Sequence, residues 1–226
     1  DWLIDDIDTL GLVDEYVVIS NHKFAHHFDA WAKEKQQKIT VVDDGTESNE
    51  TRLGAVKDIQ FAIDKLARDD EMLVIAGDNV LDFSLTKFVR YAKEKNTSCI
   101  MRYYEANEQK LTKCGVVEID DSDKIISMEE KPENPRSNLA SMGIYIFTWK
   151  LLRQMLVEDM SKEDSNHDFG KDIIPTLLNN GGNLFAYKFK GYWKDVGTID
   201  SLWEANMDLL DKGNELDLND PTWKIY

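Results

Sequence analysis

Apolar and polar positions follow two different periods along the first hundred residues. Short apolar runs, such as residues 72–76, predict buried strands, whereas residues 53–66 repeat apolar side chains at helical spacing. By these patterns the predicted strands cover residues 16–20, 38–42, 72–76 and 98–104. The predicted helices cover residues 1–4, 27–35, 53–66 and 85–95. Alternating strands and helices are typical of a parallel sheet that is covered on both faces.

The pattern changes after residue 104, where strands follow one another with few helices between them. Strands are predicted at 115–119, 125–128, 142–147 and 183–189, and helices at 149–159, 170–179 and 198–210. We therefore expect a three-layer α/β/α domain over residues 1–210, with a mostly parallel sheet and a β-rich insertion. The polar residues 211–226 are expected to form an extended linker.

Composition limits the classes of function. The chain has 226 residues, of which 42% are hydrophobic and 31% charged, which is typical of one large globular domain. A net charge of −16 disfavours binding to nucleic acid, although a nucleotide site needs only local positive charge.

Cys99 and Cys114 lie in or beside predicted strands and are not expected to form a disulfide. No apolar run approaches the roughly 18 residues of a membrane span and no signal peptide is evident, so a cytoplasmic protein is expected.

Two aspartates at predicted strand ends are the first candidates for chemistry. Asp78 follows the apolar run 72–76 and Gly77, and Asp195 precedes a turn at Gly197 and a predicted helix. In α/β proteins such strand ends carry ligand sites, and two carboxylates there could share one hard cation. Each aspartate alone could equally cap a turn or a helix.

A third candidate is the segment Glu130-Lys131-Pro132. A residue before proline adopts extended or turn backbone, which leaves the Lys131 ammonium free to contact a phosphate. An ordinary surface charge cluster is the alternative. His22, His26 and His27 are spaced for a helix, but no further ligand motif follows them, so an exposed helix surface is favoured over a zinc site.

Several of these motifs together resemble the sugar-1-phosphate nucleotidyltransferase family. The resemblance rests on Ala-Gly-Asp-Asn at 76–79, Glu-Lys-Pro at 130–132, Ser-Met-Gly at 141–143 and the run 191–206. It implies a Rossmann-like nucleotide-diphospho-sugar transferase fold. In the second half, residues 137–147, 168–175 and 223–226 resemble the adenylyltransferase branch that acts on glucose 1-phosphate. In the first half the family's adenylyltransferases usually carry Ser-Gly-Asp-His, so the halves point to different relatives.

The resemblance implies a role for each matching residue. Asp78 and Asp195 would hold Mg²⁺, Lys131 the sugar phosphate, and Glu130 and Ser141 the sugar hydroxyls. Gly115 would lie against the sugar ring, and Gly54 beside the nucleotide base. The implied substrates are a nucleoside triphosphate and a sugar 1-phosphate, with glucose 1-phosphate and ATP preferred. A thymidylyl- or uridylyltransferase is the alternative enzyme, and a non-catalytic sugar-phosphate-binding or composite domain is the alternative from another class.

The resemblance also implies parts that this sequence does not contain. In the family a strand and a Gly-rich loop, which binds the triphosphate, would precede Asp1, and a β-helix would follow Tyr226. An N-terminally truncated catalytic domain is therefore expected, with weak or no activity by itself. The unpaired sheet edge of such a domain would favour homo-oligomers.

Overall fold

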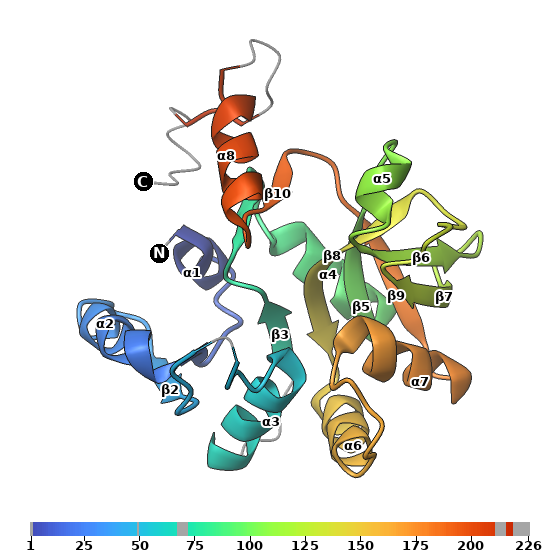
Figure 1. Cartoon of the computed structure of the whole chain (residues 1–226). Coiled ribbons are helices and arrows are strands. Elements are labelled where there is room, and N and C mark those ends of the chain that lie inside the picture. The colour runs from blue at the N-terminus through green and yellow to red at the C-terminus, as the bar shows by residue number, and fades with distance from the viewer. Residues whose placement is uncertain (1, 49, 67–71, 211–215, 219–226) are drawn as a thin grey trace.

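Helices surround strands throughout the chain in the computed structural model, which describes residues 2–48, 50–66, 72–210 and 216–218 (Figure 1). The strands are β1 (Tyr16–Ser20), β2 (Ile39–Asp43), β3 (Met72–Ile75), β4 (Asn79–Leu81), β5 (Ser98–Tyr104), β6 (Gly115–Ile119), β7 (Ile125–Glu130), β8 (Leu139–Phe147), β9 (Leu184–Lys188) and β10 (Trp193–Asp195). The helices are α1 (Trp2–Asp8), α2 (His22–Ala32), α3 (Ala55–Leu66), α4 (Thr86–Lys95), α5 (Glu108–Leu111), α6 (Trp149–Met160), the π-helical turn η1 (Phe169–Ile173), α7 (Ile174–Asn179) and α8 (Ile199–Asp208).

The largest sheet has six strands, and its direction is mixed. Strand β8 lies between β3 and β5 and is antiparallel to both, whereas β5 pairs with β9 in parallel. Strands β3, β5 and β9 therefore share one direction, as expected for a parallel sheet. The expectation of mostly parallel pairing was wrong. Strand β8 follows the β6–β7 hairpin and runs in the opposite direction to its neighbours β3, β5 and β6, so all of its pairings are antiparallel.

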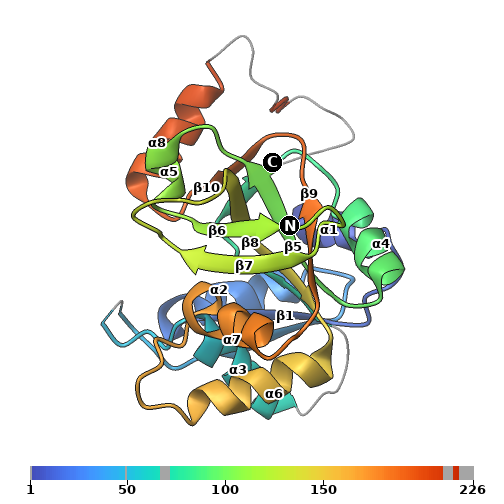
Figure 2. The same ribbon diagram turned by 90° about the vertical axis from the view of Figure 1, so that its right-hand side faces the viewer.

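Apolar side chains cover both faces of this sheet, which makes the expected three layers. Along β8, Tyr145 and Phe147 point to a core shared with α3, α6 and α7, while Met142 and Ile144 point to a second core shared with α4. Figure 2 shows α3, α6 and α7 together on one side and α4 elsewhere on the sheet. The alternation follows from the two-residue period of a strand.

The largest differences between predicted and observed helices are at α2 and at η1 with α7. The helix expected at 27–35 begins at His22, because the Asn21 side chain accepts a hydrogen bond from the Phe24 N–H and caps it there. Its first turns carry polar residues, which hid the start. The helix expected at 170–179 is divided into η1 and α7. Most of the predicted linker 211–226 lies outside the described residues.

Two smaller sheets complete the fold. Strands β1 and β2 pair in parallel, and β4 pairs with β10 in an antiparallel ladder that places Asp195 opposite Asn79. Strand β4 was not predicted, because its three residues follow Gly77-Asp78 without an apolar run of their own. This short ladder joins segments more than a hundred residues apart and carries the first part of the candidate site.

Candidate functional site

The ladder of β4 and β10 brings the two predicted aspartates together. A Cβ atom placed on Gly197 would lie 2.7 Å from Asp78 Oδ2 and 3.0 Å from Asp195 Oδ1, so both carboxylates face one point. The backbone holds them there: the Val196 N–H donates to the Asp78 carbonyl at 2.8 Å, and the Gly197 N–H donates to Asp195 Oδ1 at 2.8 Å. A side chain at position 197 would enter this space, so glycine keeps it open.

The charges in this pair repel each other. Partial desolvation, followed by repulsion from Asp195, raises the pKa of the Asp78 carboxyl. Within the described part of the chain no lysine or arginine forms an ion pair with either carboxylate. The nearest basic residue in sequence, Lys194, instead binds Glu204 at 3.1 Å and Asp208 at 3.0 Å on α8. Two adjacent carboxylates without a protein cation are suited to an external one.

The second part of the site surrounds the Glu130 carboxylate at the end of β7. A Cβ atom on Gly115 would lie 2.9 Å from Glu130 Oε2 and 3.6 Å from Ser141 Cβ, and one on Gly170 would lie 3.1 Å from Glu130 Cδ. Gly115, Glu130 and Ser141 therefore lie together, as the resemblance implied. The Glu130 side chain is only 16% exposed.

The electrostatics around Glu130 combine burial with charges of both signs. Desolvation and the Asp168 charge raise the pKa of the Glu130 carboxyl, and the Lys131 and Lys171 charges partly offset this. Lys131 Nζ lies 3.5 Å from Glu130 Oε1, and its side chain is 60% exposed. Of the two backbone forms expected before Pro132, Lys131 adopts the turn, with φ +51, and its N–H donates to the Cys114 carbonyl. The ammonium is thus held near Glu130 but accessible.

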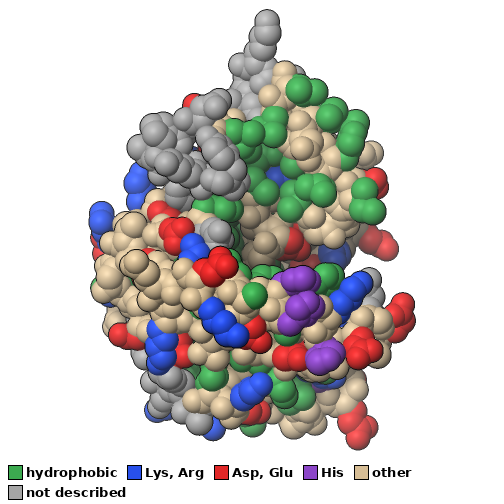
Figure 3. Space-filling model, turned by 90° about the vertical axis from the view of Figure 1, so that its left-hand side faces the viewer, with side chains coloured by type: hydrophobic (Ala, Val, Ile, Leu, Met, Phe, Trp, Pro, Cys, Tyr) green, Lys and Arg blue, Asp and Glu red, His purple; other side chains and the backbone are tan. Residues whose placement is uncertain are grey.

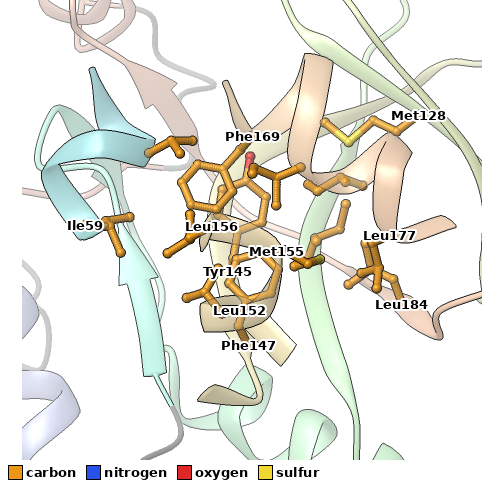
Figure 4. Close-up of a cluster of buried hydrophobic side chains, with 14 of the residues drawn as sticks. Ile59, Met128, Tyr145, Phe147, Leu152, Met155, Leu156, Phe169, Leu177 and Leu184 are labelled. Atoms are coloured by element: carbon orange, nitrogen blue, oxygen red, sulfur yellow. The ribbon is translucent and has the colours of Figure 1, made fainter. Parts of the chain in front are cut away.

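The turn η1 was not expected at this site, although its sequence had been matched to the family. The Asp168 carboxylate accepts hydrogen bonds from the N–H groups of Gly170 and Lys171, at 2.8 and 2.9 Å. Phe169 stacks on Tyr145 and Phe147 in the core, at ring distances of 5.4 and 5.7 Å (Figure 4). These contacts fix Gly170 against Glu130. The signal in the sequence was an aspartate two residues before a glycine, which is common in turns.

The two parts of the site are neighbours. Burial raises the pKa of the Cys114 thiol, and the charges of Glu130, Glu105 and Asp195 raise it further. The contacts agree: the Tyr103 ring lies 4.8 Å from that of Trp193 on β10, and Tyr103 packs against the same apolar cluster as Cys114, which precedes Gly115. Gly54 is different: it precedes α3 with φ +87, and none of the contacts in the described residues joins it to these carboxylates.

Other surface features do not add a metal site. Within the described ranges, no group of three or more His, Cys, Asp or Glu side chains is placed to hold a metal ion. Histidine side chains gather on the face that carries α2, as expected for an exposed helix, and apolar side chains gather over α8 on the same side (Figure 3). Cys99 and Cys114 are free thiols. None of the helices in the described residues is long and apolar enough to cross a membrane.

Comparison with known sequences identifies the family. A sequence model described as nucleotidyl transferase matches residues 8–212. The chain belongs to the nucleotidyl transferase family. A glucose-1-phosphate adenylyltransferase of Clostridium novyi is 52% identical over 155 residues, which are 69% of this chain and 41% of that protein. Another from Geobacillus stearothermophilus is 40% identical over 97% of this chain and 58% of its own length. The chain therefore spans about half the length of these curated relatives.

A solved structure shows the same fold. It is described as a glucose-1-phosphate thymidylyltransferase from Bacillus anthracis in complex with sucrose, and it superposes with a TM-score of 0.71. The match covers 91% of this chain and 78% of that one, at 21% sequence identity. At this identity the likeness establishes the α/β fold of the transferases, and it leaves the choice of nucleotide open.

Proposed function

We propose that this chain supplies the cation-binding and sugar-binding parts of a transferase that joins a nucleoside triphosphate to a sugar 1-phosphate and releases pyrophosphate. The proposed substrates are ATP and glucose 1-phosphate, because the curated relatives are named glucose-1-phosphate adenylyltransferases. The observation that carries the proposal is the convergence of Asp78 and Asp195 on one point at Gly197.

The sugar part follows from the contacts around Glu130. The exposed Lys131 ammonium would hold the phosphate of the sugar, so that one of its oxygens can attack the α-phosphorus of the triphosphate. Glu130 and Ser141 would bind sugar hydroxyls, and Gly115 would let the ring approach the sheet. Gly54 is proposed beside the base on the resemblance alone. Positioning and charge, rather than covalent chemistry, would supply the rate enhancement.

The carboxylate pair fits Mg²⁺. This ion prefers oxygen ligands and usually binds one or two carboxylates together with water and substrate phosphates. Asp78 and Asp195 provide such oxygens, and in the described residues no basic side chain neutralises them. When bound, the ion would offset the negative charge of the phosphates. Asp78 and Asp195 would fix its position beside the sugar part.

A pyrophosphate-release assay tests the proposal. Glucose 1-phosphate and Mg²⁺ would be offered with ATP, dTTP, UTP or GTP in turn, and calorimetry would measure glucose 1-phosphate binding separately. Any pyrophosphate release is expected to be highest with ATP. Pyrophosphate release with dTTP or UTP alone would support the alternative enzyme, a thymidylyl- or uridylyltransferase. Sugar-phosphate binding without release would support the sugar site and leave the transfer step unsupported, and absence of binding would contradict the sugar site.

A further inference from the structure

Asn79 is a buried polar residue between the two candidate metal ligands. It follows Asp78 directly, and its Cα pairs with that of Asp195 across the β4–β10 ladder. The residue is only 5% exposed. A buried amide must find partners for both its oxygen and its nitrogen, and none of the roles proposed above uses it.

Both ends of the Asn79 amide are hydrogen-bonded. Its Oδ1 accepts from the Trp193 indole Nε1 at 2.7 Å, and its Nδ2 donates to the Ala76 carbonyl at 2.9 Å. The orientation of the amide is settled by chemistry, because an indole N–H can only donate and a carbonyl can only accept. Asn79 therefore ties the chain just before Gly77-Asp78 to the strand that carries Asp195.

Trp193 is itself anchored to the large sheet. Its ring lies 4.8 Å from that of Tyr103 on β5, at an angle of 51°. A continuous series of contacts thus runs from β5 through Trp193 and Asn79 to the end of β3. The short β4–β10 ladder is held by this series as well as by its own backbone hydrogen bonds.

We propose that Asn79 is a positioning residue for the Asp78–Asp195 pair, which sets the separation of the two carboxylates and so the affinity for a divalent cation. The inference rests on the proposed function only in that the pair binds such a cation. Leucine at position 79 keeps the branched shape of asparagine but would leave the Trp193 N–H and the Ala76 carbonyl unpaired. Loss of the group that orients a metal ligand typically weakens metal binding by ~10–100-fold.

Direct Mn²⁺ binding tests the inference without turnover. MnCl₂ would be titrated into the whole chain and free Mn²⁺ followed by electron paramagnetic resonance, for the wild type, Asn79→Leu and Trp193→Phe. Trp193→Phe removes the N–H that donates to Asn79 and keeps a ring beside Tyr103. It therefore replaces Asn79→Leu as the test variant if Asn79→Leu does not fold. Asn206→Leu, an exchange of the same type on exposed α8, is the matched control.

The expected result is Mn²⁺ affinity lower by ~10–100-fold in Asn79→Leu and Trp193→Phe. The control should keep wild-type affinity, and glucose 1-phosphate affinity without metal should stay within about twofold in Asn79→Leu. Unchanged Mn²⁺ affinity in both variants would overturn the inference, as would an equal loss for both ligands in Asn79→Leu, which indicates general damage. A wild-type chain that binds no Mn²⁺ would instead overturn the proposed function and the positioning role together.

Discussion

The two parts of the candidate site hold their acids in different ways. Asp195 ends a ladder of three residue pairs and Asp78 directly precedes its other strand, and backbone and amide hydrogen bonds hold both carboxylates near Gly197. Glu130 instead lies at the end of a strand of the six-stranded sheet, packed between Gly115 and Gly170. The first part depends on hydrogen bonds and the second on close packing.

This difference predicts different sensitivities. In the carboxylate part, removing a charge should relieve repulsion in the empty protein while abolishing cation binding. In the Glu130 part, adding even one methyl group should displace the acid. Mutations that change ligand binding without changing the free energy of unfolding can therefore test whether the first part depends on hydrogen bonds and the second on close packing.

The largest effect is expected for Asp195→Asn. Losing one of two metal-binding carboxylates should lower Mn²⁺ affinity and Mg²⁺-dependent pyrophosphate release by at least ~10²-fold, more than loss of a supporting partner costs. Mn²⁺ titration measures the affinity, with Asp200→Asn on the exposed start of α8 as control. A loss smaller than tenfold would show that Asp195 does not bind the cation.

Asp78→Asn should lose cation binding without losing stability. Desolvation and the Asp195 charge raise the pKa of Asp78, so the ionised carboxylate costs folding free energy at neutral pH. Without metal, the variant should therefore melt at or above the wild-type temperature at pH 7. A clearly lower melting temperature would contradict the repulsion described here.

Lys131→Ala is expected to weaken the binding of glucose 1-phosphate and not that of ATP. Loss of a charge-assisted contact costs ~1.5–3 kcal/mol, or roughly 10- to 150-fold in glucose 1-phosphate affinity. Calorimetry should show little change for ATP, and Lys150→Ala, at an exposed position of α6, should change neither. Equal losses for both ligands would make the assignment of Lys131 wrong.

Gly115→Ala should weaken sugar binding more than stability. The new Cβ would lie 2.7 Å from Met128 Cε and 2.9 Å from Glu130 Oε2, and both atoms are ends of flexible side chains that can move. We expect about tenfold weaker glucose 1-phosphate binding, equivalent to ~1.4 kcal/mol. Gly77→Ala, where a Cβ meets nothing within 4 Å, should leave sugar binding intact. Equal sugar affinity in both variants would argue against close packing of Glu130.

The smallest effect concerns Asp58, a carboxyl that belongs to neither part of the site. Desolvation and the nearby Asp44 raise its pKa from 3.8 to about 6. Because the folded state holds this proton more tightly, the free energy of unfolding should fall as pH rises from 4 to 6. After allowance for solvent screening, Asp58→Asn should stabilise the protein at pH 7 by ~1 kcal/mol, or about 2–4 °C, and not at pH 4.

Thermal melts at both pH values measure this effect, with Asp29→Asn on exposed α2 as control. If Asp58→Asn raises the melting temperature equally at pH 4 and pH 7, proton binding at Asp58 is not the cause of the stabilisation.

Local patterns in the sequence predicted most of the fold. Strands β1, β5 and β6 have the predicted bounds, because each is a short, mostly apolar segment rich in β-branched or aromatic residues. The family and its principal motifs were also recognisable, and the comparisons confirm that family. The roles of the individual site residues remain predictions; these residues are Asp78, Asp195, Glu130, Lys131, Ser141, Gly115 and Gly54. The truncation, the linker and the association of copies also remain predictions.

Tertiary structure decided what local pattern could not. Whether Asp78 and Asp195 meet depends on the pairing of β4 with β10, and a three-residue strand has no periodicity of its own to reveal its partner. The position of Gly170 against Glu130 depends on Phe169 stacking in a core formed by β8. The sequence by itself determined which residues could carry charge and where strands such as β1, β5 and β6 lie, because these are properties of neighbouring residues. Distances between carboxylates were set only by long-range pairing, because hydrogen bonds between distant segments fix them.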